Sequence, residues 1–182
     1  EGLANNLRPG SLLIDMGTTS VLKTRAFATK LEMSGSEWVD APVSGGTTAA
    51  ESGTLTIMVG GSDQAFQQAL PWLQILGERI THVGDTGAGQ IAKSANQMIV
   101  GLTIAAVAEA FTLANANGVE PEKIREALFG GFAHSRILEL HGERMIKNDF
   151  QARAKCSIQR KDVKEAIEPV SYTHLRAHET YD

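Results

Sequence analysis

The stretch from Ile91 to Asn117 constrains the fold of this chain more than any other part of the sequence. It contains two charged residues, Lys93 and Glu109, and no proline. Apolar residues occupy every face of a helix, which is typical of a helix buried on all sides. The stretch therefore predicts one long buried helix of about 27 residues, roughly 40 Å from end to end, with Gly118 ending it.

The most apolar part of this helix, Met98 to Ala108, stops at Glu109. A helix that crosses a bilayer needs about 20 predominantly apolar residues in succession, and this run is shorter. We therefore expect no membrane segment and no membrane partner.

The residues before Gly87 follow a different pattern, in which short strands alternate with helices. Residues 11–16 form a nearly continuous apolar run, typical of a parallel strand covered on both faces. Residues 53–61 alternate apolar and polar side chains between glycines, and residues 37–43 predict another short strand. Polar residues after the first strand can cap a helix. We expect its buried stripe to be Val21, Thr24, Ala28 and Leu31.

Helix start and stop residues mark the remaining elements. Ser62 can cap a helix. Pro71 fits poorly inside a helix, so we expect it at the first turn of a second short helix that ends near Gly77. Beyond the long helix, further helices are expected over residues 121–129, 135–147 and 157–167. The sequence thus predicts an α/β part followed by a helical part.

The composition excludes several classes of protein. Hydrophobic residues make up 42% of the chain, which suits a packed core rather than a disordered segment. The net charge of −4 and the scattered basic residues do not provide the positive surface that nucleic-acid binding requires. The single cysteine, Cys156, cannot form an internal disulfide, and the first residues lack the pattern of a secretion signal. We expect a cytoplasmic protein that binds no nucleic acid.

The sequence GAGQIAKSANQ, residues 87–97, has two interpretations. Gly87, Gly89 and Ala92 fit the loose pattern of a dinucleotide-binding turn, in which glycines bring the backbone close to a pyrophosphate. That turn needs a preceding strand and, about 20 residues on, an acidic residue at the end of a second strand. Residues 78–85 are at best a weak strand, and Glu109 lies within the long helix. The context therefore disfavours a cofactor turn here.

The other interpretation centres on Lys93. Lys93, Asn96 and Gln97 stand three and four positions apart and share one helix face. A lysine in a nearly uncharged helix is costly unless something uses it, and burial can tune its pKa for catalysis. Alternatively, the side chain extends from the helix start into solvent and only its stem is packed. Periodicity alone does not separate these two arrangements.

Two longer motifs carry a resemblance to a known family. The sequence DAPVSGGTTAAESGTLTIMVGG, followed by GAGQIAKSANQMIV, resembles the β-hydroxyacid dehydrogenase family, and the resemblance runs from about residue 8 to about residue 168. It implies an α/β fold: the C-terminal part of an NAD- or NADP-binding Rossmann-type parallel sheet in residues 1–86. It also implies a long connecting helix and an incomplete all-helical domain in residues 87–168. Such helical domains build the substrate site and the contacts of a homodimer or homotetramer.

The resemblance also implies roles for individual residues. Lys93 matches the catalytic lysine of the family, and Asn96 matches the amide that neighbours it. Ser44, Gly45 and Gly46 match the loop that holds the substrate carboxylate. A serine hydroxyl and glycine amides after a strand can form an anion-binding concavity, although a tight turn that merely needs glycine would use the same residues.

Two further residues match the cofactor contacts of the family. Thr18 matches the threonine near the nicotinamide ribose, although the usual proline three residues later is Val21 here, and a threonine at this place can simply cap a helix. Lys161, in QRKDVKEA, matches a lysine that contacts the cofactor, although such a lysine is usually just solvated. His134 and His141 lack ligand spacing, so no metal site is expected.

The implied activity is hydride transfer between NAD or NADP and a small-molecule β-hydroxyacid or its aldehyde. Lys93 would donate a proton to the developing alkoxide, a role for which burial should lower its pKa. The chain lacks a histidine-asparagine-glycine run after Lys93, which speaks against 6-phosphogluconate dehydrogenases, and the lysine speaks against imine reductases. The stretches ANQMIV and GGFAHSRILELHGERM look closer to tartronate semialdehyde (2-hydroxy-3-oxopropionate) reductases than to 3-hydroxyisobutyrate dehydrogenases.

Two parts of the sequence depart from the family. The glycine-rich turn of the family belongs to an earlier strand-helix unit, so we expect a fragment that binds nicotinamide nucleotides poorly. Residues 169–182 look like translated sequencing-adapter sequence, a non-native tail, and His174 and His178 are left out of the site. The alternative to an enzyme is a non-catalytic assembly module that uses the long helix for packing.

Overall fold

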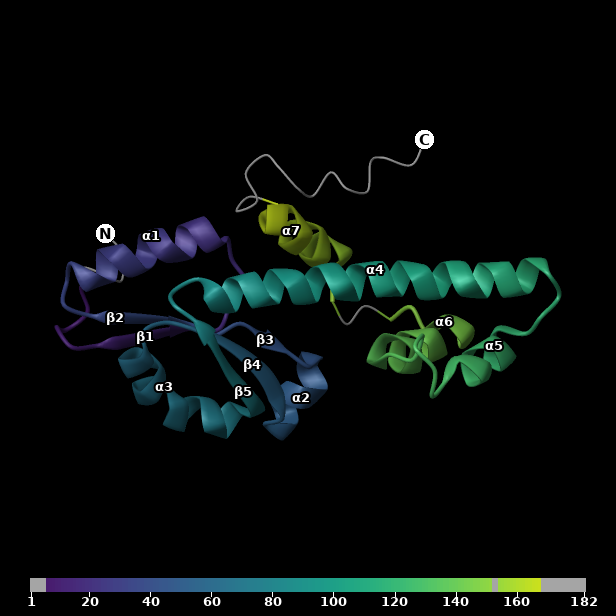
Figure 1. The fold of residues 1–182 in the computed structure, drawn as a ribbon, viewed down its shortest axis with the longest axis horizontal. Helices are drawn as coiled ribbons and strands as arrows, with labels where there is room; N and C mark the ends of the chain where they lie inside the picture. Colours follow the sequence, from purple (N-terminus) through teal and green to yellow (C-terminus); the bar gives the residue numbers. More distant parts are fainter. Residues whose placement is uncertain (1–5, 152–153, 168–182) are drawn as a thin grey trace. The chain divides into compact units, whose positions relative to one another are not determined.

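The computed structural model describes residues 6–151 and 154–167 (Figure 1). By their internal contacts these residues form two compact units. One unit runs to Ala95 and resumes at Arg160, and the other is Asn96–Gln159. The first unit contains a sheet and the second is helical. The tail expected at residues 169–182 lies outside the described residues, and the domain boundary expected after residue 86 stays a prediction.

In the described residues five strands form the sheet: β1 (Leu12–Asp15), β2 (Glu37–Asp40), β3 (Val43–Ser44), β4 (Leu55–Gly60) and β5 (Gly77–Gly84). β1 is parallel to β2 and β4 is parallel to β5, whereas β4 is antiparallel to β2 and β3. The sheet is therefore mixed. The strand predicted over residues 37–43 is divided in two, and Pro42, which has no N–H to donate, lies between the parts.

Helices cover both faces of the sheet. α1 (Val21–Glu32) lies on one face, as Figure 1 shows. Its four buried residues are those predicted. α3 (Asp63–Leu76) lies on the other face, where Ser62 caps it by accepting a hydrogen bond from the Ala65 N–H at 3.1 Å. The sequence did not predict the short α2 (Gly46–Ser52). The end of α7 (Cys156–Ile167) also belongs to this unit.

The core of the sheet unit lies between the strands and α3. It is formed by Val39, Ala41, Leu55, Ile57 and Val59 of the sheet region with Ala65, Ala69 and Leu73 of α3. Successive residues of a strand point to opposite faces. Asp40 therefore points away from this core, to the side on which the start of the long helix α4 (Ala88–Ala116) packs.

Pro71 does not begin a second helix, so this prediction is wrong. α3 continues through it as one helix from Asp63 to Leu76. A proline removes one backbone hydrogen bond and crowds the preceding turn. Ala69 and Leu73, both completely buried, lie on either side of Pro71 and pack against the sheet, which holds the helix together across this position. The predicted end near Gly77 is confirmed.

β5 occupies the residues in which the sequence showed only a weak strand. It pairs with β4 from Leu55 and Gly77 to Gly60 and Gly84, with two register shifts. The polar residues of β5 obscure its pattern; the ladder to β4 and the packing of Ile80 against the core hold this strand.

The 29 residues of α4 (Ala88–Ala116) confirm the predicted long helix. Its residues to Ala95 belong to the first unit, and the second unit contains the rest. α5 (Pro121–Leu128) begins at the expected proline. The helix predicted over residues 135–147 contains a π-helical segment, η2 (Leu138–Gly142), followed by α6 (Glu143–Ile146). The core of this unit joins Val107 and Phe111 of α4 to Leu138.

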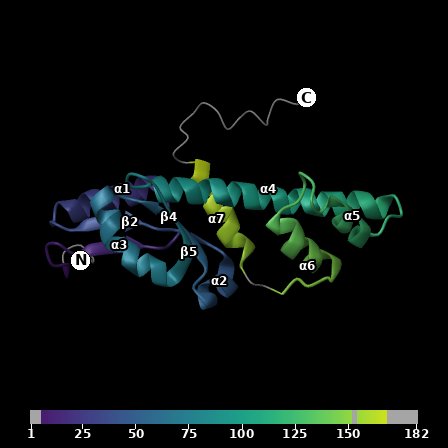
Figure 2. The same ribbon diagram turned by 60° about the horizontal axis from the view of Figure 1, so that its bottom comes forward.

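The prediction that α4 is buried on all sides is wrong for this chain. Ile99, Leu102 and Leu113 are 66%, 65% and 67% exposed, because the described residues pack on only part of the helix. Figure 2 shows α4 as one unbroken helix. By length and composition it could cross a membrane, with a mean hydropathy of 1.7 in its most apolar window. The prediction from sequence considered only the apolar run Met98–Ala108 and so did not detect this property of the whole helix. Core helices of soluble proteins pass the same test.

Candidate functional site

Lys93 lies in the second turn of α4 and is buried, with 8% of its surface exposed. Its Nζ donates a hydrogen bond to the Val43 carbonyl oxygen at 2.8 Å. Burial lowers the pKa of the Lys93 amine, and the negative charge of Asp162 opposes this shift. Of the two arrangements that the sequence left open, the structure therefore has the buried amine and not the solvent-extended one.

The Lys93 amine reaches the turn that the resemblance assigned to the substrate carboxylate. Val43 and Ser44 form β3, and Gly45 and Gly46 follow as the chain enters α2. φ is +137° at Gly45 and +69° at Gly46, values that residues with a side chain rarely adopt. A Cβ at Gly46 would meet nothing within 4 Å. The turn needs glycine, and at Gly46 it leaves open space beside the backbone.

A buried carboxylate from β2 holds the first turn of α4. Asp40 is completely buried; its Oδ1 accepts a hydrogen bond from the Gly87 N–H at 2.7 Å, and its Oδ2 accepts one from the Gln90 N–H at 2.9 Å. Burial raises the pKa of Asp40, and these two hydrogen bonds oppose the shift. A pyrophosphate at a helix N-terminus would need such amides. An internal carboxylate already occupies this anion position.

Gly89 serves the packing of α4 on the sheet. A Cβ at Gly89 would lie 2.7 Å from the Asp40 carbonyl oxygen, so only glycine allows this approach. β5 supplies the preceding strand that the sequence hardly showed, yet the amides after it bind Asp40. These contacts favour the interpretation in which residues 87–97 present Lys93 and do not cradle a cofactor.

Sequence reasoning missed Asp40 and Gln90. The Gln90 side chain is completely buried; its Nε2 donates to the Gly17 carbonyl oxygen at 2.8 Å, and its Oε1 accepts from the Thr19 N–H at 3.1 Å. The available signals were local: Gln90 precedes Lys93 by three positions, and Asp40 lies in a short predicted strand. Neither signal indicates a partner about 50 to 70 residues away, as the sequence separations of these bonds require.

Thr18 and Lys161, the two residues assigned to the cofactor, meet in the sheet unit. The Lys161 Nζ donates to the Thr18 carbonyl oxygen at 2.8 Å. The same nitrogen lies 2.9 Å from Asp162 Oδ1 and 3.0 Å from Glu165 Oε2. Partial burial acts to lower the pKa of Lys161, but these two carboxylates outweigh it and the pKa is raised. The structure thus joins two segments that are 143 positions apart in sequence.

Asn96 belongs to the helical unit. Its Nδ2 donates to Gln97 Oε1 at 2.9 Å. Gln97 and Gln159 exchange two hydrogen bonds, from Gln97 Nε2 to Gln159 Oε1 at 3.2 Å and from Gln159 Nε2 to the Gln97 carbonyl oxygen at 2.7 Å. Asn96 is thus anchored to a glutamine pair, and its contact with a substrate stays a prediction.

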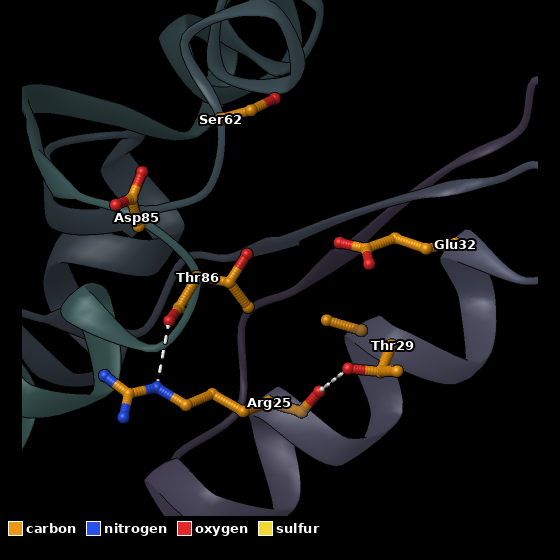
Figure 3. Close-up of a pocket in the computed structure, with 7 residues that line it drawn as sticks. Arg25, Thr29, Glu32, Ser62, Asp85 and Thr86 are labelled. Atoms are coloured by element: carbon orange, nitrogen blue, oxygen red, sulfur yellow. Dashed lines mark hydrogen bonds between the residues drawn. The ribbon is translucent and has the colours of Figure 1, made fainter.

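Two cavities lie apart from these residues. One, of about 340 Å³, is lined by residues of α1 and of the loops after β4 and β5; Arg25 Nε donates to the Thr86 carbonyl oxygen there at 3.3 Å (Figure 3). The other, of about 440 Å³, lies in the helical unit between α4 and residues 128–138. Neither is lined by a predicted site residue. Within residues 6–151 and 154–167, no group of three or more His, Cys, Asp or Glu is placed to hold a metal ion.

Comparison with known families matches both parts of the chain. Residues 1–84 match the NAD binding domain of 6-phosphogluconate dehydrogenase. Residues 87–178 match the NAD-binding domain described for NADP-dependent 3-hydroxyisobutyrate dehydrogenase. The second match extends beyond residue 168, where the resemblance was expected to end.

Individual relatives agree with these matches. A 2-hydroxy-3-oxopropionate reductase of Escherichia coli (strain K12) is 46% identical over 159 residues, which are 87% of this chain and 54% of the relative. A 2-(hydroxymethyl)glutarate dehydrogenase of Eubacterium barkeri is 38% identical over 92% of this chain and 56% of its own length. The chain thus spans about half the length of the curated relatives it matches.

A solved structure gives the same answer for the fold. The 3-hydroxyisobutyrate dehydrogenase of Mycobacterium tuberculosis with L-serine aligns with a TM-score of 0.85 and 31% identity, over 96% of this chain and 64% of that chain. The order of strands and helices, the glycine turns at residues 45–46 and 87–89 and the sequence matches therefore point to the same family. The chain belongs to the β-hydroxyacid dehydrogenase family.

Proposed function

We propose that the protein carrying this chain is an NAD(P)-dependent oxidoreductase that interconverts a β-hydroxyacid and its aldehyde. The observation that carries this proposal is the buried Lys93 amine, which lies at the Val43 carbonyl and so beside the Ser44 turn. An amine whose pKa is lowered by burial is suited to moving a proton to and from a substrate oxygen near neutral pH.

Ser44, Gly45 and Gly46 bind the substrate carboxylate in this proposal. A serine hydroxyl and the amides of a glycine turn are hydrogen-bond donors to an anion. The reacting carbon of a β-hydroxyacid is two bonds from the carboxylate carbon, so fixing the carboxylate also fixes the distance from this carbon to Lys93. Asn96, one helical turn after Lys93, hydrogen-bonds the substrate.

Lys93 acts on the oxygen of the reacting carbon. During reduction the ammonium donates a proton to the developing alkoxide, and during oxidation the neutral amine accepts the hydroxyl proton. Burial lowers the pKa of Lys93 and favours the neutral form, whereas the charge of Asp162 favours the ammonium. The amine can therefore serve both directions of the reaction.

The described residues fit a nicotinamide nucleotide at the carboxyl end of β1, where ligands of open α/β sheets bind. Thr18 lies three residues after this end, and Lys161, whose side chain is 46% exposed, reaches the Thr18 carbonyl oxygen from α7. We assign the Thr18 hydroxyl and the Lys161 amine to the nicotinamide ribose. NAD or NADP, when bound, supplies or accepts the hydride.

We infer that the substrate is 2-hydroxy-3-oxopropionate (tartronate semialdehyde). The 46% identity to the E. coli enzyme of that name supports this choice. The alternative substrate is 3-hydroxyisobutyrate, which the similarity to the mycobacterial 3-hydroxyisobutyrate dehydrogenase favours. Both substrates carry the carboxylate that the Ser44 turn requires.

We also propose that the protein is cytoplasmic and assembles as a homodimer or homotetramer. The exposed side chains of Ile99, Leu102 and Leu113 support assembly, because an apolar helix face of this kind is usually covered by a partner. Against a membrane role for α4 stands its start, where the buried polar contacts of Asp40, Gln90 and Lys93 attach it to a sheet.

A chimera with the E. coli reductase tests the activity. Its 159 aligned residues, which are 54% of that enzyme, are replaced by those of this chain, and the E. coli enzyme supplies the rest. We expect the purified chimera to oxidise NADH or NADPH in the presence of tartronate semialdehyde, with a higher kcat/KM than for oxidation of 3-hydroxyisobutyrate. A folded chimera that reduces or oxidises neither substrate would contradict the proposal.

The non-catalytic alternative is tested on the chain itself. As an assembly module it should self-associate, yet neither tartronate semialdehyde nor 3-hydroxyisobutyrate should protect Lys93 from acylation. Under the proposed function either carboxylate substrate, at millimolar concentration, slows acylation of Lys93 relative to the exposed Lys23, as read by mass spectrometry.

A further inference from the structure

The Gln90 side chain bonds to the backbone on both sides of Thr18. Its Nε2 donates to the Gly17 carbonyl oxygen at 2.8 Å and its Oε1 accepts from the Thr19 N–H at 3.1 Å. The Gln90 side chain is completely buried, whereas Gly17 is exposed and Thr19 is half-buried, so both bonds are part-buried. Gln90 thus pairs with the Gly17–Thr19 segment as a neighbouring strand would.

A primary amide can form both bonds from this position, because it carries a donor and an acceptor at every pH. A carboxylate accepts hydrogen bonds but cannot donate one, and an apolar side chain does neither. Shortening the side chain by one methylene would pull both atoms away from the segment. A buried polar group that loses its partner is costly, so the buried Gln90 amide favours the conformation in which the Gly17–Thr19 segment pairs with it.

Gln90 is itself fixed by the sheet. Its N–H donates to Asp40 Oδ2 at 2.9 Å, and Gly89 allows the helix to approach β2 closely. Because the backbone of Gln90 is held by Asp40, its side chain cannot follow the Gly17–Thr19 segment if that segment moves. The first turn of α4 therefore acts as a fixed support for the segment.

The first turns of α4 contact the proposed cofactor residues and also carry the proposed proton donor. Thr18, between the two residues that Gln90 holds, also accepts a hydrogen bond from Lys161. Lys93 follows Gln90 by one helical turn and reaches Val43. The Gln90 side chain and the three helix positions from Gln90 to Lys93 therefore connect the Thr18 segment to the Lys93 amine.

We propose that Gln90 is a positioning residue that sets the spacing between the Thr18 segment and Lys93. The effect of this spacing on turnover rests on the proposed function. The hydrogen bonds by which Gln90 sets the spacing do not depend on it. Misplacement of reacting groups by about 1 Å can reduce a rate roughly 100-fold, so a residue that fixes this spacing affects turnover without contacting substrate or cofactor.

Two substitutions and one control test the inference. Gln90→Met keeps the length and volume of the side chain but removes both bonds. Gln90→Glu keeps the acceptor for Thr19 and regains a donor to Gly17 only when the introduced carboxyl is protonated. Ser36→Ala is the control, because it removes a different buried hydrogen bond of the same unit, from Ser36 Oγ to the Arg8 carbonyl oxygen.

The first readout needs no activity. In this chain, Gln90→Met should raise the amide hydrogen-exchange rate of residues 17–19 at least about 10-fold over wild type, as expected when a buried pairing is lost. Ser36→Ala should leave the exchange of this segment unchanged. Equal exchange in wild type and Gln90→Met, with both proteins folded by circular dichroism, would overturn the inference.

The second readout is turnover in the chimera. We expect Gln90→Met to lower kcat about 10- to 100-fold with a smaller change in the KM for the aldehyde, because the bound groups are misplaced. Gln90→Glu should regain activity relative to wild type as the pH falls. Asp40 and Asp15 are the acidic groups that bond to the backbone of Gln90 and of Gly17, so wild type and Asp40→Asn are measured at each pH.

The outcomes separate the two claims. If Gln90→Met raises exchange but the wild-type chimera has no activity, the proposed function fails and the structural support by Gln90 stands. If the chimera is active and Gln90→Met changes kcat less than two-fold, or Ser36→Ala lowers it equally, Gln90 is not a positioning residue. A Gln90→Glu variant without any low-pH recovery relative to wild type would also count against it.

Discussion

The sheet unit and the helical unit each have an apolar core, but the sheet unit differs in its buried polar side chains. In the sheet unit, buried polar side chains bond directly to distant backbone groups, as Asp40, Gln90 and Lys93 do. In the helical unit, the core is the apolar contact of Val107 and Phe111 with Leu138. Hydrogen bonds prescribe lengths and angles, whereas apolar packing mainly requires volume to be filled. Of the proposed site residues, Lys93, Thr18 and the Ser44 turn belong to the first unit, and Asn96 belongs to the second.

The largest expected effect separates chemistry from stability within the sheet unit. Lys93→Met should lower kcat of the chimera about 10²- to 10⁴-fold, the usual contribution of a general acid or base. Met fills similar space and removes a buried amine, so the free energy of unfolding at neutral pH should not fall. Stopped-flow oxidation of NADH and urea unfolding measure the two effects. Lys23→Met, on the exposed face of α1, is the control and should change neither.

Removing the apolar contact of the helical unit should affect stability alone. Leu138 is 1% exposed, and Leu138→Ala should lower the free energy of unfolding by about 2 to 5 kcal/mol through lost burial and an internal cavity. The hydrogen exchange of the Gly17–Thr19 segment should stay at its wild-type rate at the same temperature. An increase there would show that the polar contacts of the sheet unit depend on the helical core.

The carboxylate that holds α4 gives the corresponding test in the sheet unit. Asp40→Ala leaves the Gly87 and Gln90 amides without their acceptor, which should cost about 2 to 3 kcal/mol in free energy of unfolding. Unlike Leu138→Ala, it should also raise amide exchange in the first turn of α4. If urea unfolding and exchange both match wild type, the attachment of α4 to the sheet does not depend on this carboxylate.

The buried amine predicts a pH dependence of stability. Burial lowers the pKa of Lys93 in the folded chain below its ordinary value of 10.5, so between the two values the unfolded chain binds more protons. Stability from this group should therefore rise as the pH increases through that window. Urea unfolding of wild type should show this rise relative to Lys93→Met. Parallel pH profiles of the two proteins would contradict a lowered pKa.

The smallest effect is expected on the exposed face of α4. Leu102 is 65% exposed, so Leu102→Ala should change the free energy of unfolding of the monomer by less than about 0.5 kcal/mol, in contrast to Leu138→Ala in the same unit. Dilute urea unfolding measures the monomer. If copies assemble through this face, Leu102→Glu should also weaken association in sedimentation experiments. A loss of several kcal/mol in the free energy of unfolding of the Leu102→Ala monomer would show instead that Leu102 is covered within one chain.

Elements that depend on neighbouring residues were predicted well. The length of α4 follows from a run without proline or frequent charge, and the cap of α3 follows from Ser62. The buried stripe of α1 was predicted residue by residue, since helix periodicity alone places those side chains on one face. The family itself was recognised from two motifs, and the positions of Lys93 and the Ser44 turn agree with it.

Features that depend on distant residues were missed or misjudged. Pro71 stays inside α3 because contacts with the sheet hold the helix on both sides of it. β5 is a strand because β4 lies beside it, and α4 is exposed because no described residue covers much of it. Asp40 and Gln90 look like ordinary polar residues until their partners, 47 and 73 positions away, are brought to them.

The sequence by itself determined that strands alternate with helices before Gly87, that one long helix follows and which residue types are available for chemistry, because these depend on local periodicity and chain stiffness. Only the tertiary structure decided that the Lys93 amine is buried at Val43, that Lys161 reaches Thr18 and that an internal carboxylate fills the anion position of α4. Burial and hydrogen-bond partners depend on which distant segments share the same space, and no local pattern encodes that.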